Sequence, residues 1–139
     1  MRSTRSGASP LAAQSRNIPF PQQIACLPEG IIAGPDGALW FTELHSNKIG
    51  RITTSGAITE FALPTAASQP FRITRGSDGA LWFTESGANK IGRITISGDV
   101  TEYVVPTANS GPYDITAGPE GTLWFTEQRG SKIGQISIT

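Results

Sequence analysis

The sequence predicts an all-β fold, a partial β-propeller of about three four-stranded antiparallel blades. The stretch Leu-Trp-Phe-Thr-Glu at Leu39–Glu43 returns unchanged at Leu81–Glu85 and at Leu123–Glu127, with a spacing of 42 residues both times. Each copy lies among short apolar runs that are separated by turn residues, and no run has the 3.6-residue period of a helix. Four short strands in a unit of about 40 to 45 residues are typical of a propeller blade. Units of a β-helix are shorter and are not built of successive hairpins.

The repeat divides the chain into a tail and three blades. Residues 1–19 are rich in Ser, Arg, Ala and Pro and have no strand or helix period, which predicts a mobile N-terminal tail. Residues 20–139 form the three blades, with repeats near 28–69, 70–111 and 112–139, the last of them incomplete. The segment Phe20–Leu27 is expected to hold one short strand, at an edge because of Pro21.

The first repeat shows the plan of a blade. After the first strand, the sequence Gly34-Pro35-Asp36-Gly37 is a strong tight-turn signal, because Gly and Asp accept the φ values that a hairpin requires. The expected strands are Ile31–Ala33, Ala38–Glu43, Lys48–Thr53 and Ile58–Leu63. The second repeat follows the same plan, and the third lacks its fourth strand.

The composition excludes some classes of partner. Lys and Arg together number 11 and Asp and Glu together number 11, so the formal net charge is zero. A neutral chain offers no basic surface for nucleic acid or for an anionic membrane, and no run of about 20 apolar residues could span a bilayer. Cys26 is the only cysteine, so no intrachain disulfide can form, and we expect a cytoplasmic protein.

The repeated stretch also predicts how the blades pack. Along a strand, Leu39 and Phe41 point to one side and Trp40 and Thr42 to the other. Both faces therefore carry side chains suited to burial, as a sheet between two neighbouring sheets requires. Glu43 ends the run, which is expected to place a carboxylate where the strand leaves the packed layer.

These residues resemble the streptogramin B lyase family, also known as virginiamycin B lyases. The resemblance rests on GPDGALWFTE at Gly34–Glu43, on NKIGRIT at Asn47–Thr53 and again at Asn89–Thr95, and on ITEF and VTEY strands followed by LPT and VPT. It covers residues 28–139. It implies a seven-bladed propeller that opens cyclic streptogramin B antibiotics at their ester bond by elimination, with Mg²⁺. A cyclic peptide is thus the implied ligand.

The resemblance also implies where the reacting groups would lie. In the family, a catalytic His follows a Pro in the loop that enters a blade's inner strand, and a Glu fourteen residues later lies beside it. After Pro28, Pro70 and Pro112 this chain has Glu29, Phe71 and Tyr113, so no catalytic residue is assigned. The matching carboxylates Glu43, Glu85 and Glu127 are all present and are the candidate metal ligands by family resemblance. Because they occur in every repeat, they fit blade architecture equally well.

Two further sets of residues have alternative interpretations. Phe71 and Tyr113 either offer an apolar floor to a cyclic peptide or pack as plugs between blades. His45, the single histidine, lies in a connection two residues past Glu43, where a polar loop residue is the simpler interpretation.

Three functional hypotheses follow. The first is a lyase-like propeller fragment that is inactive alone, because the catalytic His positions are Glu29, Phe71 and Tyr113. The second is a binding or scaffold module that associates through its open blade faces, with two chains making a six-bladed ring, because three blades cannot close a circle. The third is metal-dependent lactone hydrolysis, for which Glu29, Gln69 and Asp114 are the additional candidate ligands, and it is the least favoured.

Overall fold

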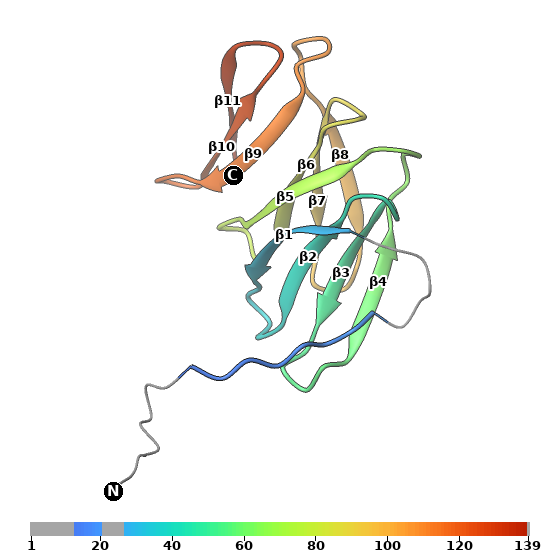
Figure 1. The fold of residues 1–139 in the computed structure, drawn as a ribbon. Helices are drawn as coiled ribbons and strands as arrows, with labels where there is room; N and C mark the ends of the chain where they lie inside the picture. Colours follow the sequence, from blue (N-terminus) through green and yellow to red (C-terminus); the bar gives the residue numbers. More distant parts are fainter. Residues whose placement is uncertain (1–12, 21–26, 139) are drawn as a thin grey trace, which may run out of the picture.

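The computed structural model describes residues 13–20 and 27–138, which form eleven β-strands in three antiparallel sheets (Figure 1). The described part of the chain contains no helix, and therefore none that could cross a membrane. The predicted fold class, three propeller blades built on a 42-residue repeat, is confirmed. Each sheet follows the order of its strands in the sequence, as successive hairpins require.

The first two blades have four strands each, and the third has three. In the first blade the strands are β1 (Pro28–Ala33), β2 (Leu39–Glu43), β3 (Lys48–Ile52) and β4 (Ile58–Ala62). In the second they are β5 (Pro70–Arg75), β6 (Leu81–Glu85), β7 (Lys90–Ile94) and β8 (Val100–Val104). In the third they are β9 (Pro112–Ala117), β10 (Thr122–Glu127) and β11 (Lys132–Ser137).

The inner strands begin earlier than the sequence predicts. The first strand was expected to begin at Ile31, but β1 begins at Pro28, which pairs with Glu43. The register then shifts between Pro28 and Ile31, which marks a bulge. The bulge interrupts the regular alternation of side chains between the two faces of the strand, and the bounds of the strand were predicted from that alternation. Most of the short strand expected at Phe20–Leu27 falls on residues outside the described ranges.

An aspartate in the turn stabilises the first hairpin of each complete blade. The Asp36 carboxylate accepts hydrogen bonds from the Ala38 amide and from Trp40 Nε1, and it forms a 2.8 Å ion pair with Arg51 Nε. Asp78 repeats these contacts with Ala80, Trp82 and Arg93. Arg51 thus has a specific ion-pair partner within its blade.

The alternation along the second strand gives each blade two distinct faces. We call the side that carries Trp40, Thr42 and their equivalents the Trp face, and the side that carries Phe41 and its equivalents the Phe face. Trp40 and Ile49 on the Trp face of the first blade pack with Leu81, Phe83 and Ile94 on the Phe face of the second. Trp82 and Ile91 pack in the same way with Leu123 and Phe125 of the third. Each core thus lies between two blades, as expected for a repeat protein.

A hydroxyl group joins neighbouring blades at their inner strands. Thr42 Oγ1 accepts a hydrogen bond from the Gly30 amide and donates one, 2.9 Å long, to the carbonyl of Phe71 in the next blade. Thr84 Oγ1 accepts from the Arg72 amide and donates to the carbonyl of Tyr113, also at 2.9 Å. Both threonine side chains are fully buried. Each one therefore satisfies two backbone groups at the boundary between blades.

We predict that Thr84→Val lowers the free energy of unfolding by about 1 to 3 kcal/mol, because valine keeps the shape and leaves the Arg72 amide and the Tyr113 carbonyl unpaired. Urea denaturation followed by tryptophan fluorescence measures the change. Thr101→Val, on the exposed side of β8, is the matched control and should stay within about 0.5 kcal/mol of the parent chain. Equal effects of the two substitutions would contradict a specific role for the hydroxyl.

Candidate functional site

The three positions that follow the prolines come together along the inner strands. β1, β5 and β9 are neighbours in space, each at the inner edge of its blade (Figure 1). Glu29, Phe71 and Tyr113 therefore lie in a row across three blades. The carbonyls of Phe71 and Tyr113 are fixed by the threonine of the preceding blade, so the row is positioned by buried hydrogen bonds.

Aromatic and cationic groups make continuous contact along this row. The rings of Phe71 and Tyr113 have centroids 4.4 Å apart at an angle of 40°. The Arg72 guanidinium lies 4.2 Å from the centre of the Phe71 ring, which is a cation–π contact. Arg72 Nη1 also lies 3.7 Å from Glu29 Oε1, which forms an ion pair across the first blade boundary.

The structure shows the packing interpretation of Phe71 and Tyr113, whereas a ligand floor stays a prediction. Phe71 is half-buried because Tyr113 and Arg72 cover it, so it does act as packing between blades. Tyr113 keeps 38% of its surface exposed and the Arg72–Glu29 pair is also partly exposed, so a flat polar and aromatic surface remains open. Such a surface can stack on rings and donate hydrogen bonds to carbonyl groups. We call Glu29, Phe71, Arg72 and Tyr113 the inner-strand row.

The three repeated carboxylates lie in a different environment from the one expected. Glu43 and Glu85 are 0% exposed and Glu127 is 6% exposed, so they sit inside the packed layer and not where the strand leaves it. The reason is that Pro28, Pro70 and Pro112 pair with them and extend each sheet past its expected end. Each glutamate belongs to a separate sheet. Among the described residues, no group of three or more His, Cys, Asp or Glu side chains could hold a metal ion.

In the second blade the buried carboxyl group faces another one. Glu85 lies on β6 and Glu102 on β8, and Gly92 of β7 stands between them. A Cβ atom at Gly92 would come within 2.7 Å of Glu85 Oε2 and 2.2 Å of the Phe83 ring. Only glycine leaves room here for the two side chains to approach each other.

The two carboxyl groups titrate in opposite directions. Burial, followed by the hydrogen bond to Glu102 and the negative charge of Glu102, raises the pKa of Glu85 to about 8. Burial alone also raises the pKa of Glu102, but hydrogen bonds from Thr65 and Glu85 and the charge of Lys90 outweigh it and lower that pKa. Thr65 Oγ1 donates to Glu102 Oε1 at 2.7 Å and Lys90 Nζ lies 3.5 Å from the same oxygen. Near pH 7, the raised pKa of Glu85 therefore favours its neutral form beside the Glu102 carboxylate.

A neutral carboxyl group does not fit magnesium. Mg²⁺ requires charged or strongly polar oxygen ligands in near-octahedral geometry, and Glu85 is protonated and enclosed by the Phe83 ring and Gly92. The magnesium role of Glu43, Glu85 and Glu127 stays a prediction that rests on family resemblance.

Sequence reasoning missed two members of these clusters. At the position of Arg72 the other repeats have Gly30 and Asp114. A residue type that differs between otherwise similar repeats could have marked this position as a candidate for a functional role. Glu102, which is equivalent to Glu60 of the first repeat, was not singled out from the sequence, yet it is half-buried in the network described above. His45 lies exposed in the connection between β2 and β3.

Comparison with known proteins decides the family. A family model described as the virginiamycin B lyase family matches residues 4–139. The chain therefore belongs to the virginiamycin B lyase family. The virginiamycin B lyase of Bordetella bronchiseptica is 51% identical over 45 residues, which are 32% of this chain and 15% of that protein.

Solved structures of virginiamycin B lyases share the fold. The selenomethionine-substituted virginiamycin B lyase from Staphylococcus aureus superposes with a TM-score of 0.80 at 48% identity, over 88% of this chain and 45% of that one. A catalytically inactive variant of the same lyase, solved with quinupristin, gives a TM-score of 0.78 at 48% identity, over 86% of this chain and 43% of that one. A gluconolactonase from Xanthomonas campestris, at 20% identity and a TM-score of 0.64, supports the fold alone. The chain spans less than half the length of these lyases.

We predict that the stability of this lyase-family chain falls as the pH rises from about 4.5 to about 8. The folded chain holds a proton on Glu85, with its pKa of about 8, which the unfolded chain releases above the usual value of 4.5. The contribution is therefore complete below pH 4.5, is lost progressively up to pH 8, and is on the order of 5 kcal/mol. Glu85→Gln, which keeps a donor toward Glu102, should remove most of this slope.

Urea denaturation at pH 5 and at pH 8.5 measures the effect. The expected result is that Glu85→Gln stabilises the chain more at pH 8.5 than at pH 5. Glu120→Gln, at an exposed turn position, is the control, and it should leave the free energy of unfolding unchanged at both pH 5 and pH 8.5. A parallel pH profile of parent and Glu85→Gln chains would show that the carboxyl group is ionised in the fold.

Proposed function

We propose that this chain is a lyase-like propeller module that binds a cyclic peptide of the streptogramin B class on the inner-strand row and does not open it. One observation carries the proposal. The three positions where the family resemblance would place a catalytic histidine are brought together in space, and they hold Glu29, Phe71 and Tyr113. The row thus occupies the position where the resemblance places the family's catalytic histidine, and its side chains are suited to recognising a ligand.

The exposed groups of the row suit a macrocyclic peptide. The open face of Tyr113 can stack on aromatic or ring substituents, and Arg72 retains donors that its ion pair with Glu29 does not use. The Staphylococcus aureus relative was solved with quinupristin, which supports this class of ligand.

The absence of an imidazole from the row argues against turnover. Elimination requires a base that removes a proton beside the ester carbonyl and an acid that protonates the leaving group. Glu29 is ion-paired with Arg72, Phe71 cannot transfer a proton, and Glu85 is buried and already protonated near pH 7. For a whole lyase, the Mg²⁺-dependent elimination of the family remains the proposed reaction.

A scaffold module without catalysis is the second candidate function. The observation that favours it is an exposed apolar face on the third blade, where Trp124 is 38% and Ile133 is 64% exposed. Self-association through such faces is compatible with ligand binding, because the inner-strand row lies on other strands.

We predict that quinupristin binds the purified chain and that Tyr113→Ala weakens the binding at least fivefold, because the exposed ring is lost from the row. Isothermal titration calorimetry measures the dissociation constant. Tyr103→Ala is the matched control, since Tyr103 is 45% exposed on the outer strand β8, and it should leave the constant unchanged. Absence of binding in the parent chain would contradict the ligand role of the row.

We predict further that quinupristin incubated with the chain stays cyclic, with or without Mg²⁺. Mass spectrometry distinguishes the cyclic form from the linear product over hours. The full-length Staphylococcus aureus lyase serves as the positive control. Linear product formed by the parent chain would overturn the proposed inactivity while leaving the proposed binding intact.

A further inference from the structure

Arg72 differs from the two arginines on the third strands of the complete blades. The side chains of Arg51 and Arg93 each donate a hydrogen bond from Nε to an aspartate of their own blade, at 2.8 and 2.9 Å. Among the described residues, the Arg72 guanidinium donates no hydrogen bond, and its ion pair with Glu29 is 3.7 Å long. A guanidinium carries five N–H donors in a fixed fork. Arg72 therefore has donors that the fold does not use.

The surroundings of Arg72 nevertheless hold its side chain in place. The guanidinium lies 4.2 Å from the centre of the Phe71 ring and 6.0 Å from that of Tyr113. Its backbone amide donates to the Oγ1 atom of Thr84, which is fully buried. The Arg72 side chain is still 36% exposed. Its donors are thus oriented by packing and stay within reach of a ligand, which lowers the cost of ordering them on binding.

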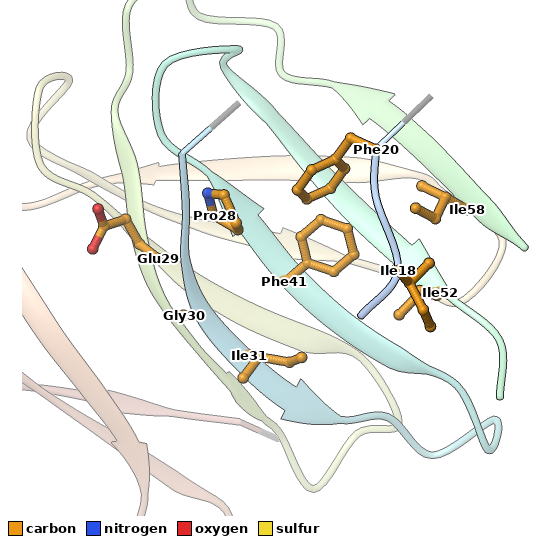
Figure 2. A pocket seen from close by; sticks show the side chains of 9 residues that line it. All are labelled: Ile18, Phe20, Pro28, Glu29, Gly30, Ile31, Phe41, Ile52 and Ile58. Carbon is orange, nitrogen blue, oxygen red and sulfur yellow. The ribbon is translucent and has the colours of Figure 1, made fainter. Parts of the chain in front are cut away.

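Glu29 is a carboxylate that a ligand can replace beside Arg72. Figure 2 shows that its side chain points away from the apolar side chains on the Phe face of the first blade, such as Phe41 and Ile58. Its side chain is 32% exposed, and a partly exposed ion pair of this length contributes little to stability. A second carboxylate can therefore share Arg72 with Glu29 or displace it at small cost.

The next carboxylate along the inner strands is directed elsewhere. Asp114 has on β9 the position that Arg72 has on β5, and its Oδ1 accepts a 2.9 Å hydrogen bond from the Ile115 amide. Within the described residues, the ion pairs of Arg72 include Glu29 and not Asp114. Arg72 is thus the cation of the row that can accept a further anion. The rings of Phe71 and Tyr113 beside it suit the aromatic or apolar part of the same ligand.

We propose that Arg72 makes the inner-strand row selective for peptides with a free carboxylate, so that a linear, opened streptogramin B peptide binds more tightly than the cyclic form. The inference rests on the proposed function, because it adds a preference to the same ligand surface. Two parallel N–H donors of Arg72 bind the two carboxylate oxygens, which is the geometry that a guanidinium favours. Opening an ester, by elimination or by hydrolysis, frees such a carboxylate. The preferred ligand is therefore the product of a reaction that the row does not perform.

Three probes separate the carboxylate from the opening of the ring. Quinupristin is the cyclic form, and mild alkaline hydrolysis of its ester gives a linear acid. Coupling of that acid to methylamine gives a linear amide without the charge. Isothermal titration calorimetry at about 50 mM salt, where screening is weak, measures the dissociation constants. The parent chain should bind the linear acid at least fivefold more tightly than the linear amide, and more tightly than quinupristin.

Three variants assign the preference to Arg72. Arg72→Gln should reduce the ratio of the amide and acid dissociation constants to about 1, because glutamine keeps polar groups and loses the charge. Arg75→Gln removes the same charge at the exposed far end of β5, so it is the matched control and should keep the ratio of the parent. Glu29→Gln should tighten binding of the acid at least twofold, because it removes the competing carboxylate. Binding of the linear amide shows that each variant is folded.

The outcomes distinguish this inference from the proposed function. If quinupristin binds but the acid binds no more tightly than the amide, or if Arg72→Gln keeps the preference, the role of Arg72 is overturned and the binding of cyclic peptide stands. If quinupristin does not bind while the acid binds through Arg72, the proposed function fails and the carboxylate preference stands. Absence of binding for all three probes would overturn both.

Discussion

The structure depends on the interface in which Trp and Ile of one blade pack with Phe and Leu of the next. A four-stranded sheet of this size buries neither face by itself, and at about 25 cal/mol for each Å² of apolar surface the sheets gain stability only when they are stacked. In the stretch Leu-Trp-Phe-Thr, Leu and Phe face the preceding blade, and Trp and Thr face the following one. A single strand thus contributes to both interfaces of its blade. The fully buried Trp40, Leu81 and Phe83 show how complete that burial is between the first two blades.

This packing also determines the environment of the repeated glutamates. The Phe83 ring lies against Gly92, and the space left by the missing side chain lets Glu85 approach Glu102. In so dry a place two negative charges would be costly, and sharing one proton is the lower-energy arrangement. Thr65 and Lys90 then stabilise the charge that remains on Glu102. The buried glutamate of the second blade is thus explained by interactions within that blade and with Thr65 in the connection before it.

The sequence allowed the fold to be predicted almost completely, because a 42-residue period and the turn sequences are local signals. It predicted the row of Glu29, Phe71 and Tyr113 as equivalent positions, but it could not show that Arg72 joins them through its ion pair with Glu29 and its contact with Phe71. The burial of Glu43 and Glu85 was also missed. It depends on the pairing of β1 and β5 beyond a bulge and on a partner from another strand, neither of which has a local signature.

The inner-strand row and the blade core are physically one unit. Thr84 takes part in the repeated stretch on β6, yet its hydroxyl bonds the Arg72 amide and the Tyr113 carbonyl, which are the backbone of the row. A substitution in the core therefore shifts Arg72 and Tyr113 together and does not alter one side chain alone. Because the threonine is the same in every repeat while the residues it holds are Gly30, Arg72 and Asp114, the scaffold allows each blade to present a different group at one fixed place. Diversity at the row is thus obtained without loss of the buried hydrogen bonds that support it.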